Sequence, residues 1–196
     1  LGDVYKRQPQ IEVAVGDPPA GALENNTIAL VFRHLVDLSE RDIELIKSFG
    51  TTNGIDIYLQ PGGIDSVKKI SNDSGKQRLY YSLPAYSLKL GFHPMDFTQI
   101  NGEMNTMIVD RVVEMLDLQE DDSVLDLFCG LGNFTLPIAT KVNSVTGVEA
   151  SQEMVERAKE NASQNKLFNV KFFAEDLYKL PVTKACLLYT SPSPRD

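Results

Sequence analysis

Cysteine is scarce in this sequence, with two residues in a chain of 196. Two thiols exclude a disulfide framework, and they exclude a four-cysteine zinc or iron–sulfur site built from this chain alone. Apolar runs are also short, since none approaches the ~20 residues of a membrane helix, and the amino terminus lacks the charged-then-apolar layout of a signal peptide. We therefore expect no membrane association and a cytoplasmic location.

An excess of basic residues is missing as well. The chain has 19 lysines and arginines against 27 acidic residues, which gives a net charge of −8. This balance argues against a surface that is basic all over, and so against binding of nucleic acid by this piece. Hydrophobic residues at 42% and charged residues at 23% are typical of a globular chain.

The two ends of the chain differ from the rest. Residues 186–196 have no helix or strand period and look like translated sequencing-adaptor read-through, and residues 1–8 look like their counterpart. The alternative is a pair of genuine flexible tails. We exclude both segments from fold reasoning, which leaves Cys129 as the only cysteine treated as authentic, and we expect the remainder to be a fragment cut at both ends.

Residues 9–95 predict a small antiparallel α+β domain. Ser39 is expected to cap a helix, with Asp42 three residues later as a weak capping box, and Gly50 and Gly54 are expected to end that helix. Alternating or β-rich runs predict strands at 11–15, 27–33, 55–59, 66–70, 79–83 and 86–92.

Residues 96–185 follow a different pattern, in which strands and helices alternate. The first helix has an apolar residue every four positions, at Met104, Ile108, Val112 and Leu116, and this face is widened by Met107, Val109 and Met115. After it come predicted strands at 124–128, 144–149 and 169–173, with helices at 134–141 and 152–164 between them. This order predicts an α/β, Rossmann-like fold with a parallel, doubly wound sheet, of which about half is present.

A glycine turn joins the first of these strands to its helix. Gly130 and Gly132 allow the backbone to turn sharply and to approach a ligand closely. Asp126, before the turn, is placed to accept hydrogen bonds from a cationic amine or a hydroxyl. Glu149 follows 23 residues later at the end of the second strand, where an acid takes both ribose hydroxyls. The pattern predicts a nucleoside site, and a purely structural tight turn is the alternative.

The same turn favours S-adenosylmethionine over a nicotinamide dinucleotide. The dinucleotide pattern needs a third small residue for close packing near the pyrophosphate, whereas this chain has Thr135 there. An acid four residues before the first glycine would repel a diphosphate, but it suits a ligand that carries an ammonium group. We therefore expect a pocket for a methyl donor.

Several of these segments together resemble the RNA uracil-C5 methyltransferases. They are Asp-Leu-Phe-Cys-Gly-Leu-Gly-Asn-Phe-Thr-Leu-Pro-Ile-Ala at 126–139, Val-Glu-Ala at 148–150 and Glu-Asn-Ala-x-x-Asn at 160–165. Upstream, residues 92–101 are similar to the Phe-x-Gln-x-Asn segment of that family. The branch that the chain resembles most is the 23S ribosomal RNA enzyme that makes 5-methyluridine, with the transfer-RNA branch as a near neighbour.

The resemblance implies a set of residues around S-adenosylmethionine: Gln99, Phe128, Gly130, Gly132, Asn133, Glu149 and Asp176. Gln99 would contact the methionine end, Glu149 the ribose and Asp176 the adenine edge. Phe128 and Asn133 would line the pocket. The alternative for Gln99 is an ordinary polar cap before a helix, and for Asp176 a loop acid after a strand.

The resemblance also implies where the chemistry takes place. The family adds a cysteine to uracil C6 so that C5 accepts the methyl group, and a base then removes the C5 proton. Those groups are expected beyond residue 185, so no catalytic residue is assigned here. Cys129 is expected to be a packing residue, and two single histidines, His34 and His93, predict no metal site.

The expected partner is an RNA substrate, most simply ribosomal RNA, bound by a monomer. The RNA-binding barrel of the family, and the iron–sulfur cluster of its ribosomal branch, would precede residue 9. Two alternatives stay open: a Rossmann-like methyltransferase acting on transfer RNA, a small molecule or a protein, and a nucleoside-binding module without catalytic activity.

Overall fold

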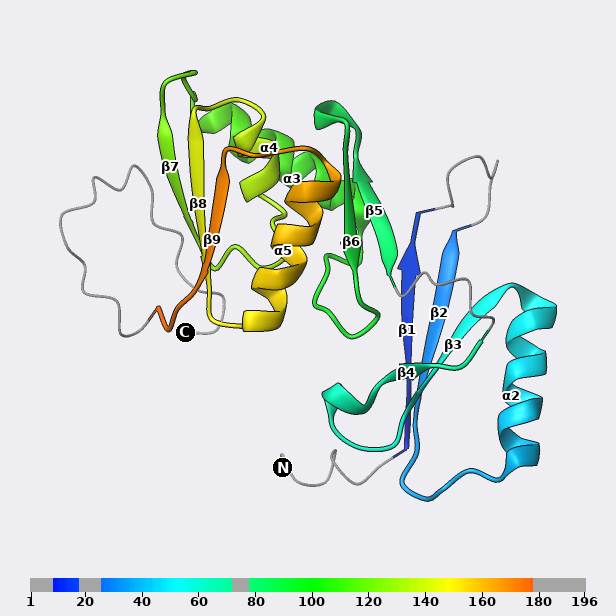
Figure 1. Cartoon of the computed structure of the whole chain (residues 1–196). Coiled ribbons are helices and arrows are strands. Elements are labelled where there is room, and N and C mark those ends of the chain that lie inside the picture. Colours follow the sequence, from blue (N-terminus) through cyan, green and yellow to red (C-terminus); the bar gives the residue numbers. More distant parts are fainter. Residues whose placement is uncertain (1–8, 18–25, 72–77, 178–196) are drawn as a thin grey trace. The chain divides into compact units, whose positions relative to one another are not determined.

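The computed structural model describes residues 9–17, 26–71 and 78–177, so the predicted adaptor-like ends lie outside the described residues (Figure 1). The chain divides into two compact units. One comprises Leu1–Ser82 with Gly91–Gly102, and the other comprises Leu83–Leu90 with Glu103–Asp196. Among the described residues, no helix is long and apolar enough to cross a membrane.

The first unit is built on a four-stranded sheet in the order β1-β2-β3-β4. Its strands are β1 (Gln10–Gly16), β2 (Thr27–Arg33), β3 (Ile55–Gln60) and β4 (Lys68–Lys69). The pairs β1–β2 and β3–β4 are antiparallel, but β2 and β3 are parallel. The prediction of a purely antiparallel layer was therefore wrong. The physical reason is the helix α2 (Glu40–Asn53) between them, since a helical crossover returns the chain in the same direction.

The ends of α2 follow the sequence signals in part. Ser39 Oγ accepts a hydrogen bond from the Asp42 N–H at 3.2 Å, and the Asp42 carboxylate accepts from the Ser39 N–H at 3.1 Å, which confirms the capping box. Gly54 ends the helix in a left-handed conformation, with φ of 67°. Gly50 does not end it. A Cβ at Gly50 would lie 2.5 Å from Ile57 Cγ1, so this glycine lets α2 approach β3 closely.

Two further predictions for this region had different outcomes. The strand expected at 66–70 is reduced to the two residues of β4, because the short 3-10 helix η1 (Ile64–Ser66) occupies its start. The strands expected around Pro84 are present as β5 (Leu79–Leu83) and β6 (Leu88–Phe92), which pair with each other on either side of the 3-10 helix η2 (Pro84–Tyr86). The division between the two units runs through this pair of strands.

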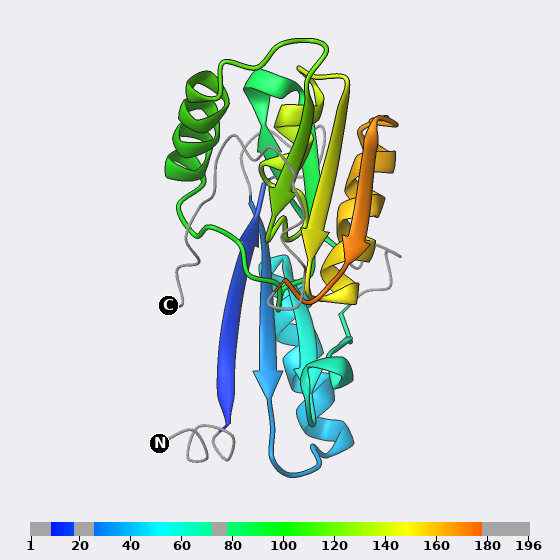
Figure 2. The ribbon, with the colours of Figure 1, turned by 90° about the vertical axis from the view of Figure 1, so that its left-hand side faces the viewer.

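The second unit contains a three-stranded parallel sheet in the order β7-β8-β9. The strands are β7 (Ser123–Leu127), β8 (Ser144–Glu149) and β9 (Val170–Ala174). They are joined by α4 (Thr135–Ala139) and α5 (Gln152–Gln164), and Figure 2 shows β8 and β9 side by side and pointing the same way. The predicted α/β order, in which helices alternate with parallel strands, is confirmed.

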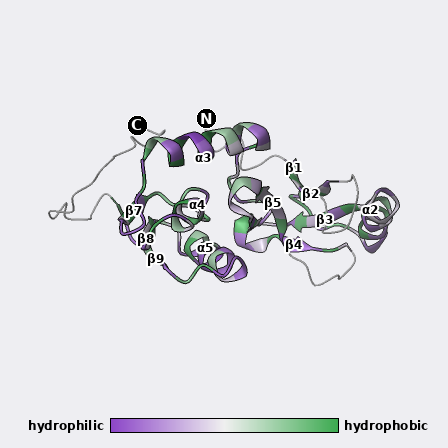
Figure 3. Ribbon diagram, turned by 90° about the horizontal axis from the view of Figure 1, so that it is seen from above, coloured by the Kyte–Doolittle hydropathy of each residue, from purple (hydrophilic) through white to green (hydrophobic). Residues whose placement is uncertain are grey.

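Helix α3 (Gly102–Met115) precedes this sheet, and it buries the predicted apolar face only in part: Val109 is fully buried and Leu116 packs against the core cluster, but other predicted residues are exposed. Met104 is 49% exposed and Ile108 is 42% exposed, whereas Asn105 and Val109 are buried. The reason is geometrical, since a repeat of four residues drifts by about 40° per step on a helix of 3.6 residues per turn. Figure 3 shows hydrophilic and hydrophobic residues mixed along α3.

The core of the second unit holds the start of α4 in place. Thr135 and Leu136 are fully buried, and Ile138 joins Val145 of β8 in one apolar cluster. Burial of a side chain such as leucine contributes ~1.5–3 kcal/mol relative to its exposed state. The turn between β7 and α4 is therefore fixed at both ends by packed elements.

Candidate functional site

The glycine turn follows the carboxyl end of β7. Three of its residues have left-handed backbone angles: Phe128 with φ of 60°, Gly130 with 53° and Gly132 with 99°. A Cβ at Gly132 would lie 3.0 Å from Leu136 Cγ, whereas one at Gly130 would meet only Met154 Cε at 3.8 Å. The turn is thus tight towards α4 and open at Gly130, so a ligand can approach its backbone there.

Phe128 is the one residue of these three that is not glycine. A left-handed phenylalanine carries backbone strain of ~1–3 kcal/mol, and such strain persists only where the surroundings impose it. The side chain of Phe128 remains 47% exposed, at the carboxyl end of β7. An exposed aromatic ring held beside an open turn is suited to stacking on a flat ligand.

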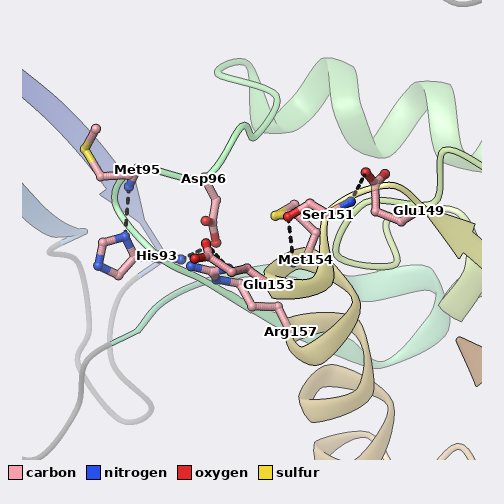
Figure 4. A network of polar contacts seen from close by, with 8 residues as sticks. All are labelled: His93, Met95, Asp96, Glu149, Ser151, Glu153, Met154 and Arg157. Carbon is pink, nitrogen blue, oxygen red and sulfur yellow. Dashed lines mark hydrogen bonds and ion pairs between the residues drawn. The ribbon is translucent and has the colours of Figure 1, made fainter. Parts of the chain in front are cut away.

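Glu149, the last residue of β8, uses its carboxylate to hold three backbone N–H groups. Its Oε2 accepts from Gly130 N at 3.1 Å, and its Oε1 accepts from Ala150 N at 2.8 Å and from Ser151 N at 3.1 Å. Figure 4 shows the Glu149 carboxylate beside Ser151, with their hydrogen bond as a dashed line. The carboxylate thereby ties the glycine turn to the end of β8 and to the cap of α5. Of its roughly four acceptor positions, three are occupied, so accepting from two ribose hydroxyls requires the release of one N–H.

Asp126, within β7, is half-buried and accepts a hydrogen bond from Thr135 Oγ1 at 2.5 Å. Burial raises the pKa of Asp126 to about 6, the hydrogen bonds from Thr135 oppose this shift, and the negative charge of Glu149 adds to it. Thr135, which stands where a dinucleotide-binding turn has its third small residue, is therefore the hydrogen-bond partner of Asp126. The pair fixes the first residue of α4 to the sheet.

Two asparagines that are almost fully buried support the turn from neighbouring helices. On α3, Asn105 is 5% exposed, and its amide forms two reciprocal hydrogen bonds with the amide of Asn133, at 3.1 and 2.9 Å. On α5, Asn161 is 2% exposed and donates to the Leu131 carbonyl oxygen at 3.1 Å. Sequence reasoning did not single out Asn105, although a polar amide inside an apolar helix face is a usable signal.

Asn165, the last residue of the Glu-Asn-Ala-x-x-Asn segment, binds a strand instead of the glycine turn. Asn165 Oδ1 accepts from Lys89 N at 2.9 Å, and its Nδ2 donates to the Lys89 carbonyl oxygen at 2.9 Å. It binds both backbone groups of one residue in β6, as a neighbouring strand would. Asn165 therefore secures β6 against the end of α5.

The predicted site residues fall into two groups. The second unit brings Phe128, Gly130, Gly132, Asn133 and Glu149 together at the carboxyl ends of β7 and β8. Asp176 follows β9 and is exposed, close after the Glu175 N–H that donates to the Glu149 carbonyl oxygen at 3.0 Å. Gln99 is exposed in the first unit, on the segment before α3, and its contact with a cofactor stays a prediction.

Cys129 lies inside the turn and is 5% exposed. Burial, followed by the negative charges of Asp126 and Glu149, raises the pKa of its thiol to about 12. A thiol of this kind is protonated at neutral pH and is a poor nucleophile. This environment supports the interpretation of Cys129 as a packing residue. Within the residues that the structure describes, no group of three or more His, Cys, Asp or Glu side chains could hold a metal ion.

Comparison with known proteins gives consistent matches. Residues 118–187 match a family described as a methyltransferase domain. The chain is 48% identical over 171 residues to a 23S rRNA (uracil(1939)-C(5))-methyltransferase of Alcanivorax borkumensis. This match covers 87% of this chain and 37% of the relative. It is 46% identical over 181 residues to the protein of that name from Hahella chejuensis, covering 92% and 39%. The chain thus spans less than two fifths of the length of these relatives.

A solved structure agrees with the fold. The tRNA (uracil-54, C5)-methyltransferase of Pyrococcus abyssi, in complex with S-adenosyl-L-homocysteine, superposes with a TM-score of 0.60 at 20% sequence identity. The match covers 87% of this chain and 40% of that one. At this identity the likeness shows the fold, and it confirms the predicted Rossmann-like methyltransferase architecture.

Proposed function

We propose that the chain belongs to the RNA uracil-C5 methyltransferase family and that it carries the cofactor-binding part of an enzyme that methylates uracil C5 in RNA. Residues 96–185 are the proposed first half of its methyltransferase domain, and residues 9–95 a small central domain. The proposed substrate is 23S ribosomal RNA, because the relatives at 42–48% identity carry that name. The observation that carries the proposal is the glycine turn tied to Glu149 at the carboxyl ends of β7 and β8.

The proposed cofactor is S-adenosylmethionine, which supplies an electrophilic methyl group. The chain offers one group for each part of such a molecule. The turn leaves space beside the backbone of Gly130, and Glu149 keeps one acceptor position for a ribose hydroxyl. Phe128 presents an exposed ring at the same edge of the sheet, and Asp176 follows the next strand.

Electrostatics favour a cationic ligand over a diphosphate. Asp126 and Glu149 lie close enough for the charge of one to raise the pKa of the other. A positive charge bound nearby would relieve their repulsion, whereas a diphosphate would increase it. A sulfonium with an amino-acid tail satisfies this condition. A dinucleotide does not.

RNA enters the proposal as the substrate of the enzyme rather than as a ligand of this chain's general surface. The net charge of −8 is unsuited to binding many phosphates. We therefore assign binding of the methyl donor to this chain. We also propose that the enzyme acts as a monomer in the cytoplasm.

The first test is calorimetric titration of the 196-residue chain with S-adenosylhomocysteine, S-adenosylmethionine and NAD. We expect saturable binding of the first two at one site and none of NAD. Binding of NAD with equal affinity, or of none of the three at millimolar concentration, would refute the cofactor assignment.

The second test addresses the substrate. The segment 9–177 replaces the matching segment of the Alcanivorax borkumensis relative, and the chimaera is assayed for transfer of tritiated methyl groups to unmodified 23S ribosomal RNA and to transfer RNA. Transfer to ribosomal RNA that is lost in the Glu149→Ala chimaera supports the proposal. A folded chimaera that binds the cofactor and methylates only transfer RNA contradicts the ribosomal assignment.

A further inference from the structure

Asn105 is a polar side chain in a place where an apolar one would be expected. It lies in the first turns of α3, on the face that also buries Val109. Asparagine is a poor residue for a helix interior, and a buried amide is unfavourable unless it is hydrogen-bonded. The Asn105 amide forms hydrogen bonds with the amide of Asn133, which is 28 positions away in the chain.

The two amides restrain each other. Each donates one N–H and accepts one hydrogen bond, at 3.1 and 2.9 Å, so a flip of either amide alone would oppose like groups. The pair therefore fixes the side-chain angles of Asn133 before any ligand arrives. Asn133 lies in the glycine turn, next to Gly132, where the proposed cofactor binds.

We propose that Asn105 is a positioning residue, which holds the amide of Asn133 in the orientation that binds S-adenosylmethionine. This inference rests on the proposed function, because it requires Asn133 to face the cofactor. Ordering a free side chain on binding weakens affinity, and a side chain that is already ordered avoids this loss. Without Asn105, binding should therefore weaken by about two- to tenfold.

The test is a double-mutant cycle on the affinity for S-adenosylhomocysteine, measured by calorimetry on the whole chain. The variants are Asn105→Ala, Asn133→Ala and the double variant. Asn169→Ala is the matched control, because the Asn169 amide likewise makes two hydrogen bonds, donating to the carbonyl oxygens of Ala139 and Val142, but it lies before β9 at the opposite edge of the sheet. Its loss should lower the unfolding temperature and leave the affinity unchanged.

We expect Asn105→Ala to weaken binding and the double variant to bind no more weakly than Asn133→Ala alone, because the first residue acts through the second. Additive losses, or parent-like binding by Asn105→Ala, would overturn the inference while leaving the proposed function intact. If the parent itself does not bind, the proposed function fails and the inference fails with it.

A second variant guards against a loss of folding. Asn105→Leu fills the same buried position with a good helix former. If this variant unfolds at or above the parent's temperature and still binds more weakly, a role limited to stability is excluded. If it binds as tightly as the parent, the positioning role is refuted.

Discussion

Replacing Glu149 by alanine removes more than a contact to a ribose. The carboxylate accepts three backbone hydrogen bonds, from Gly130, Ala150 and Ser151. Alanine leaves all three N–H groups without that partner, and it frees the glycine turn from the end of β8. The substitution should therefore reduce both stability and cofactor binding.

The magnitudes follow from the exposure of the three donors. Ala150 is exposed, so water replaces the carboxylate there, whereas Gly130 and Ser151 are half-buried. A hydrogen bond to a charged group is worth ~1.5–3 kcal/mol when shielded from water. We expect a loss of ~1–3 kcal/mol in the free energy of unfolding, and a ten- to hundredfold weaker affinity for S-adenosylmethionine, since ~1.4 kcal/mol is a factor of ten.

Calorimetric titration, together with thermal unfolding, measures both effects. Glu120→Ala is the control, since it removes the same charge from an exposed turn before β7, at the other end of the sheet, and should change the affinity by less than about twofold. Glu149→Gln keeps one oxygen for Ala150 and Ser151 and should fall between parent and alanine. If Glu149→Ala bound the cofactor as tightly as the parent, the nucleoside site would have to lie elsewhere.

Three further predictions concern the interior of the second unit. In a Cys186→Ser background, Cys129 should react with iodoacetamide at pH 8 at least about tenfold more slowly in the folded chain than in urea, because burial raises its pKa to about 12; equal rates would contradict its burial. Asp126 has a pKa of about 6 in the folded chain against an ordinary 3.8, so between these pH values the folded chain binds more protons than the unfolded chain. The stability that Asp126 contributes therefore falls as pH rises through this window. Asp126→Asn should remove that part of the pH slope of the unfolding temperature, and an unchanged slope would argue against the shift. Gly147→Ala would place a Cβ 2.7 Å from the ring of Phe172 and should destabilise the chain by ~1–3 kcal/mol in urea unfolding, whereas full stability would show that the ring moves freely.

Much of the second unit could be predicted from local patterns. The turn from Asp126 to Phe134 and the acid at Glu149 each depend on a few neighbouring residues, and both are found on the expected elements. Strand direction follows from the same patterns, because short helical crossovers impose parallel strands. Local chemistry was sufficient there.

The predictions that were wrong concern features that depend on contacts between residues far apart in the chain. A glycine at position 50 predicts the end of a helix, yet Gly50 lies inside α2, where the absence of a Cβ lets Ile57 pack against its backbone. Apolar spacing identified the buried face of α3 only in part, because Asn105 turns inward to meet an amide 28 positions away. The parallel pairing of β2 with β3 is likewise a tertiary fact, since the strand pattern alone fits either direction.

The three backbone N–H groups bound by Glu149 also allow ligand binding to be followed by hydrogen exchange at single residues. The N–H groups of Gly130, Ala150 and Ser151 belong to two different segments, the glycine turn and the start of α5, but share one acceptor. Their exchange with deuterated solvent is therefore coupled, because any opening that withdraws the carboxylate exposes all three at once. A ligand that shares the carboxylate would slow exchange at the two amides that keep it and hasten exchange at the one displaced. The pattern of exchange would thus identify which hydrogen bond gives way when the site is filled.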